Sequence, residues 1–127
     1  METPQLTVLN LYRLKASAET FTAAITALAG RVEREGERGL LSYRFWVNET
    51  DGTARAVIDY ATPQAWIGHH DISMGWPEMK ALHAVAGLED VTFLGRLTPE
   101  IRAWLAKSSL TAKVHDGFVP AAGFRRT

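Results

Sequence analysis

Apolar and polar positions follow two different rhythms along this chain, and together they predict strands and helices in a fixed order. Residues 5–13, 40–47, 53–60 and 88–97 alternate with a period of two or are continuously apolar, as β-strands are. Between them lie two segments whose apolar positions are three and four residues apart, which predicts helices. The expected architecture is therefore α+β, a four-stranded antiparallel sheet with the helices on one face.

Capping residues set the expected helix bounds. Ser17 is placed to cap a long helix that continues to about Arg38 and ends at Gly39. Thr62 caps the second helical segment, and Pro63 follows at its first position. The sequence Met-Gly-Trp-Pro at 74–77 predicts a break within that segment.

The two central strands are joined by an Asp51-Gly52 turn, which is typical of a β-hairpin. Pairing Asn48 with Thr53 then gives each strand two distinct faces. One face, expected to lie under the helices, carries Leu41, Tyr43, Phe45, Ala56, Ile58 and Tyr60. The other is mixed, with Ser42, Arg44, Trp46, Arg55, Val57 and Asp59.

The C-terminal part is too apolar to be a free tail. Thr98-Pro99-Glu100 is expected to start a short helix that runs through Trp104 and Leu105, followed by a small strand at 111–115 and an extended segment. We expect this part to pack on the core or on a partner subunit. The whole chain, 1–127, is then one domain with its core at 5–97 and a C-terminal addition at 98–127.

Composition narrows the possible functions. The chain has 14 basic and 14 acidic residues, and this balance argues against nucleic acid or an anionic membrane as a partner. There is no cysteine, which excludes disulfides and thiolate chemistry and is compatible with a reducing cytoplasm. Residues 1–11 lack the pattern of a signal peptide, so we expect a cytoplasmic protein.

Three segments carry a resemblance to a known family. They are Tyr43-Arg44-Phe45-Trp46-Val47, Val57-Ile58-Asp59-Tyr60 and Thr62-Pro63-Gln64-Ala65-Trp66-Ile67-Gly68-His69. In this pattern the chain resembles the dimeric α/β-barrel superfamily, and within it the antibiotic biosynthesis monooxygenase domains. The resemblance implies a ferredoxin-like βαββαβ fold and a homodimer joined through the mixed sheet face. The 74–77 segment and the C-terminal addition depart from the family's minimal domain.

The resemblance also implies a chemistry, cofactor-independent oxygenation of a small phenol- or quinol-like aromatic. His69 would be the general base, Arg44 would steady the substrate anion, and Asn10 would be a neutral donor. Histidine suits the base because its ordinary pKa lies near neutrality. The expected substrate contacts are Tyr12, Trp46, Arg55, Asp59, Trp66, Trp76 and His83. We expect the pocket between the sheet and the 62–85 helical segment.

Other functions stay open at this point. Asn10, His69 and His83 also correspond by position to residues of haem-degrading members, with His83 as the iron ligand. No metal is expected, because there is no metal-ligand motif and adjacent histidines on a helix, such as His69-His70, should not share a face. A dimer that binds a small ligand or serves in stress without catalysis is the alternative from another class. Then His69 would be exposed, Arg44 would pair with Asp59, and Asn10 would bond to a neighbour.

Overall fold

The computed structural model describes residues 3–126, in which five strands and four helices form two layers. The ends of the expected 1–127 domain, residues 1, 2 and 127, lie outside the described residues. In chain order the elements are β1 (Leu6–Leu14), α1 (Ala18–Glu35), β2 (Leu40–Asn48), β3 (Thr53–Tyr60), α2 (Pro63–Ser73), α3 (Pro77–Val85), β4 (Ala86–Gly95), α4 (Pro99–Lys107) and β5 (Lys113–Phe118). The α+β class expected from the sequence is confirmed.

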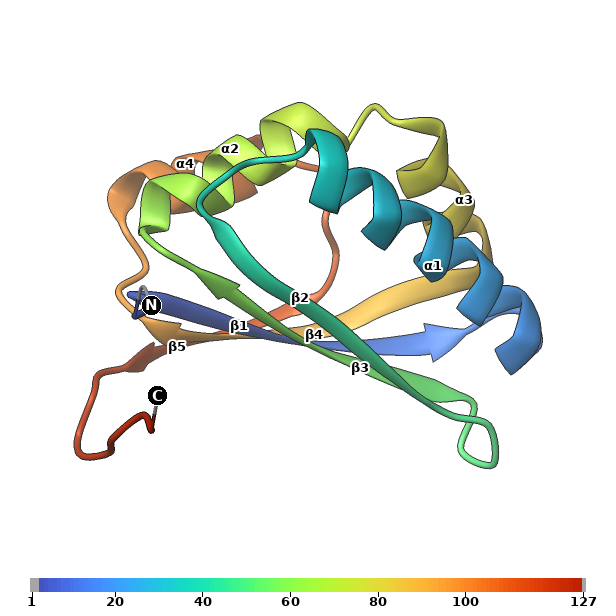
Figure 1. The fold of residues 1–127 in the computed structure, drawn as a ribbon, viewed down its shortest axis with the longest axis horizontal. Helices are drawn as coiled ribbons and strands as arrows, with labels where there is room; N and C mark the ends of the chain where they lie inside the picture. Colours follow the sequence, from blue (N-terminus) through green and yellow to red (C-terminus); the bar gives the residue numbers. More distant parts are fainter. Residues whose placement is uncertain (1–2, 127) are drawn as a thin grey trace.

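The sheet has the strand order β2-β3-β1-β4-β5, and the helices cover one of its faces (Figure 1). Its first four strands pair antiparallel, as expected, but β5 pairs parallel with β4. The expected four-stranded antiparallel sheet is therefore wrong at this edge. The reason is the connection: α4 crosses over the covered face and returns the chain in the direction of β4, which is the condition for a parallel pair.

The hairpin has the register expected from its turn. Asn48 pairs with Thr53, and Gly52 has φ +67°, a conformation that favours glycine. Even-numbered residues of β3 are buried under the helices. Leu41 departs from the expected pattern, because a register shift between Leu40 and Ser42 leaves its side chain exposed.

The helices begin where their caps predicted. The hydroxyl oxygens of Ser17, Thr62 and Thr98 accept hydrogen bonds from backbone amides three residues further on. The expected end of the first helix at Arg38 is wrong, because the backbone becomes extended at Gly36. The break at 74–77 is confirmed, since α2 ends at Ser73 and α3 begins at Pro77.

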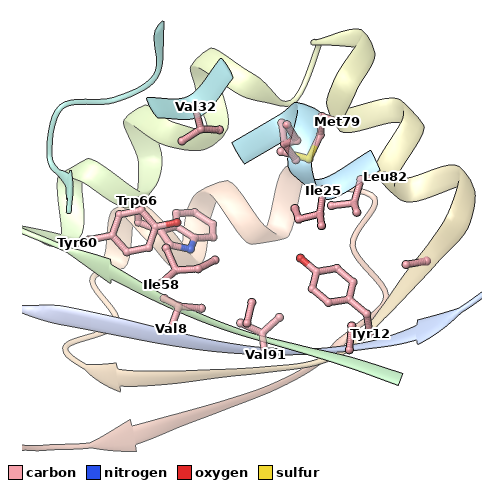
Figure 2. Close-up of a cluster of buried hydrophobic side chains, with 14 of the residues drawn as sticks. Val8, Tyr12, Ile25, Val32, Ile58, Tyr60, Trp66, Met79, Leu82 and Val91 are labelled. Carbon is pink, nitrogen blue, oxygen red and sulfur yellow. The ribbon is translucent and has the colours of Figure 1, made fainter. Parts of the chain in front are cut away.

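The hydrophobic core lies between the helix layer and the covered face of the sheet (Figure 2). Ile101 of α4 is fully buried there, so the C-terminal helix packs on the same core as the rest of the chain. Within residues 3–126, no helix is long and apolar enough to cross a membrane.

Candidate functional site

A cavity of about 290 Å³ lies between the covered sheet face and the helices. The sheet forms the floor of this cavity. The strand register places Asn10 between Val91 of β4 and Ala56 of β3. Ala56 and Ala54 carry only a methyl group, so the sheet lacks side-chain volume beside Asn10 and Tyr12.

The roof of the cavity is formed mainly by α2. Trp66, His69 and His70 all line it, since residues three and four positions after Trp66 are its neighbours on the helix surface. The ring centroids of the two histidines are 5.0 Å apart. Both histidines thus reach the same cavity, because both flank the same tryptophan, although the sequence predicted only that the adjacent pair is a poor metal chelate. That spacing was the signal by which His70 could have been found from the sequence.

The C-terminal addition supplies one wall. The Trp104 ring lies edge-on to Trp66 and His70, with centroids 5.2 and 5.1 Å away. Its Nε1–H donates to Asp71 Oδ1 at 2.9 Å, which fixes the ring plane. Residues 108–111, which follow α4, complete this wall. Sequence reasoning predicted that this part packs on the molecule, but not that it lines the site.

His70 has a defined tautomer. Its Nδ1 lies 2.7 Å from the carbonyl oxygen of Trp66, and because a carbonyl can only accept, Nδ1 carries the proton. Burial lowers the pKa of His70 to about 4, so the ring is neutral at pH 7. Its Nε2 then has a free lone pair. His70 is thus a hydrogen-bond acceptor in the lining of the cavity.

His69 is almost completely buried, with 2% of its surface exposed. Its ring lies between Tyr43 and Tyr60, at centroid distances of 5.5 and 6.1 Å. Within the described part of the chain, its Nδ1 has no hydrogen-bond partner. Burial first, and the neighbouring His70 second, lower the pKa of His69 to about 3. The reason for choosing it as the base, a pKa near neutrality, is therefore wrong, although it does line the cavity.

Asn10 and Tyr12 form a hydrogen-bonded pair on the floor. Asn10 Nδ2 donates to the Tyr12 hydroxyl oxygen at 3.1 Å, which leaves the tyrosine's own proton available for another acceptor. Burial raises the pKa of Tyr12 to about 12, so its hydroxyl stays protonated. Figure 2 shows this hydroxyl pointing from the sheet toward the helix layer. The pair therefore offers a neutral donor.

The rim of the cavity carries Lys15 and His83. His83 is exposed, and partial burial together with the charge of Lys15 lowers its pKa. His83 therefore connects the lining with solvent and is neutral at pH 7.

Several residues expected at the site lie elsewhere. Arg44, Trp46, Arg55 and Asp59 are on the outer face of the sheet and do not line the cavity. The Arg44 guanidinium lies 5.3 Å from the centre of the Trp46 ring, whereas Asp59 accepts a hydrogen bond from Thr7 at 2.6 Å. The alternative ion pair of Arg44 with Asp59 is thus not formed.

Trp76 also lies outside the cavity. Its ring is covered by the Arg31 guanidinium at 4.1 Å, and Arg31 is bonded to Glu78 at 3.0 Å. These contacts connect α1 with the start of α3. The sequence-expected residues that the structure does bring together in the cavity are Asn10, Tyr12, Trp66, His69 and His83.

Other parts of the described molecule lack this combination of groups. Between the end of α1 and β2 lies another cavity, of about 390 Å³, whose charged residues are Glu33, Glu37 and Arg38 and which contains no histidine. Across residues 3–126, no three His, Asp or Glu side chains come together as a metal site. The cavity under α2 is therefore the one that combines aromatic walls with groups able to exchange protons.

Solved structures resemble this chain in fold. MupZ from Pseudomonas fluorescens aligns with a TM-score of 0.71 and 16% identity over 98% of this chain and 96% of its own. SnoaB, a cofactor-independent oxygenase from Streptomyces nogalater, aligns with a TM-score of 0.62 and 15% identity over 76% of this chain and 98% of its own.

A presumed antibiotic biosynthesis monooxygenase from Caulobacter crescentus aligns with a TM-score of 0.52 and 20% identity, over 75% of this chain and 92% of its own. No protein-family model matches the sequence, and no curated protein matches it significantly. The resemblance to the antibiotic biosynthesis monooxygenase domains is thus confirmed at the level of the fold.

Proposed function

We propose that this chain is a cofactor-independent monooxygenase for a small, electron-rich phenol or quinol. The observation that supports it is a cavity with tryptophan walls and, at neutral pH, uncharged histidine, tyrosine and asparagine groups. An aromatic substrate that must lose a proton and react with oxygen needs this combination. The fold shared with SnoaB, a cofactor-independent oxygenase, is a second support.

The substrate ring packs against Trp66, Trp104 and His70. Trp66 and His70 stack on each other with centroids 3.9 Å apart and planes at 31°, whereas the Trp104 ring stands edge-on to both. The walls therefore present aromatic surface in two orientations to a substrate ring. The volume of about 290 Å³ is near the low end of ligand pockets, which favours a substrate of one or two fused rings.

In this proposal two histidines remove the substrate's proton: His70 accepts it and His83 releases it. The Nε2 lone pair of His70 accepts the substrate's hydroxyl proton, and His83 passes it to solvent at the rim. The pKa values of His69 and His70 are both low, so His70 is preferred to His69 for its geometry, because the Trp66 carbonyl holds the proton on Nδ1 and leaves Nε2 as the acceptor. Proton transfer to a group of pKa about 4 is uphill, and stabilisation of the phenolate offsets part of that cost. Tyr12, held by Asn10, donates to the developing phenolate, the role that the sequence assigned to Arg44. His69 acts as a neutral hydrogen-bonding group.

The reaction balances without an external reductant. The substrate anion gives one electron to O₂, and the two radicals combine to form a C–O bond at the ring carbon. The resulting hydroperoxide loses water, so that phenol and O₂ become quinone and H₂O. One oxygen atom enters the product and the other leaves as water.

The haem-degrading alternative has weaker support. Asn10, His69 and His83 do all line the cavity, as that alternative requires. However, a cavity of about 290 Å³ is much smaller than a haem macrocycle, and the Trp104 wall closes one side. The residues present therefore do not fit haem, and no step is assigned to it.

The test is oxygen consumption with a panel of hydroquinones and naphthols. We expect turnover that falls by roughly 100-fold or more in His70→Ala, because a positioned acid–base group contributes at least that much. His115→Gln is the matched control, since His115 pairs with Asp90 outside the cavity, and it should leave turnover unchanged.

Three outcomes would contradict the proposal. Binding of these aromatics without turnover would favour the non-catalytic ligand-binding alternative. A Soret shift on adding haem that disappears in His83→Ala would favour haem chemistry. Equal turnover in His70→Ala and the native protein would remove His70 as the proton acceptor.

The functional unit in this proposal is a homodimer joined through the outer sheet face. That face carries apolar side chains from every strand of the sheet. Trp46 is 52% exposed, Leu94 38% and Phe118 51%, and Leu9, Leu11 and Val57 are partly exposed beside them. A continuous apolar surface of this extent is typical of a protein interface. A second copy of the same face is the expected partner, because it carries the same mixture of apolar and charged side chains.

A further inference from the structure

Few kinds of ionisable residue line the cavity. Its ionisable residues are three tyrosines, three histidines and one lysine, with no aspartate, glutamate or arginine among them. Burial raises the pKa values of the tyrosines, and those of the histidines are lowered, so none of these six is charged at pH 7. Lys15 is therefore the single charge of the lining at that pH.

Lys15 is held at the edge of the cavity by its backbone. Its amide donates to the carbonyl oxygen of Val85 at 2.8 Å, which fixes the residue after β1 against the end of α3. Its side chain lies over Gly87, where an added Cβ would be 3.9 Å from Nζ. Its charge also contributes, after burial, to the lowered pKa of His83.

Among residues 3–126, no carboxylate lies within 4.0 Å of this ammonium group. Glu89, an acid on the same strand as Gly87, is held instead by the Arg13 guanidinium at 2.5 Å. A cation that lines an apolar cavity without a partner gains most from an anion brought by the ligand.

We propose that Lys15 binds an anionic substituent of the substrate, so that this site takes a hydroxyarene carboxylate rather than a neutral phenol. This inference rests on the proposed function for the reaction, but binding tests it separately. The ring lies among Trp66, Trp104 and His70, the hydroxyl meets the proton-accepting group, and the carboxylate meets Lys15 at the rim. The carboxylate stays near solvent, which limits its desolvation cost.

The experiment compares two probes that lack a phenolic hydroxyl and so cannot turn over, 2-naphthoate and 2-naphthalenemethanol. Affinities are measured by calorimetry with the native protein and with Lys15→Met. We expect the native protein to prefer naphthoate and Lys15→Met to bind it roughly tenfold more weakly, while the alcohol binds both proteins equally. Raising the ionic strength should weaken naphthoate binding only where Lys15 is present.

Two further variants control for charge and for folding. Lys80→Met makes the same change in net charge on the exposed surface of α3, outside the cavity, and should bind naphthoate as the native protein does. Lys15→Arg keeps the cation and should stay within about threefold of native affinity.

The proposal is overturned if neither probe binds, if the native protein shows no preference for the carboxylate, or if Lys15→Met and Lys80→Met bind naphthoate alike. Failure of the oxygenase assay with naphthoate binding intact would refute the proposed reaction and leave the anion site standing.

Discussion

The two faces of the sheet carry chemically different residues although they come from the same five strands. The covered face forms the floor of the cavity, where buried Tyr12 keeps its proton, and α2 above it adds buried His69 and part-buried His70, both held in their neutral forms. The outer face bears Arg44 and Arg55, which remain in contact with water, beside the exposed ring of Trp46. The difference shows that the positions suited to proton chemistry here are those that exclude charge, whereas the arginines belong to a surface.

This comparison predicts first that the outer face joins two subunits. Trp46→Glu places a charge on that face, on the edge strand β2, and should convert a dimer into a monomer, because an unpaired charge is costly to bury. Val47→Glu is the matched control, since Val47 pairs with the buried Ala54 and so belongs to the opposite side. Light scattering at micromolar concentration gives the masses. A native protein that is already monomeric would refute the interface.

The second prediction concerns two tryptophans, Trp66 in the core and Trp46 on the outer face of the sheet. Trp66 is 3% exposed, so Trp66→Ala should lower the free energy of unfolding by about 3–5 kcal/mol through lost burial and a new cavity. Trp46→Ala should act only through association. Its effect on Tm should therefore depend on protein concentration, whereas that of Trp66→Ala should not. Denaturation at several concentrations checks both, and equal, concentration-independent losses would contradict the difference between the faces.

The third and smallest effect concerns pH. The folded-state pKa of His69 is about 3, below its unfolded value of 6.5, so only the unfolded state takes up its proton between these values. Stability should be unaffected by this residue above pH 6.5 and should fall as the pH decreases toward 3. At pH 5 the loss from His69 is roughly 2 kcal/mol.

Urea unfolding at pH 7 and pH 5 measures this loss. His69→Gln should reduce the difference between the two pH values, because glutamine has no proton to take up in the unfolded state. If the His69→Gln variant keeps the native pH dependence, the loss of stability between pH 7 and pH 5 does not come from His69.

The elements with local signals were predictable from the sequence alone. Ser17, Thr62 and Thr98 cap their helices through contacts three residues away, and Asp51-Gly52 sets the pairing of Asn48 with Thr53. Periodicity also assigned the faces of the hairpin, since alternate side chains of a strand point to opposite sides. Asn10, Tyr12, Trp66, His69 and His83 do line one cavity, but that expectation came from the family resemblance and not from these local patterns.

The remaining features depend on contacts between distant parts of the chain. The parallel β5, and the position of Trp104 against Trp66 and His70, follow from how α4 crosses the covered face, 34 residues after His70 in the case of Trp104. The neutral state of the histidines depends on desolvation, which no short segment encodes. The sequence by itself determined the order of elements and the residues of each face. Only the tertiary structure determined that the histidines and tyrosines of the cavity are uncharged and that Lys15 is the cation beside them. The reason is that burial depends on how distant parts of the chain pack together.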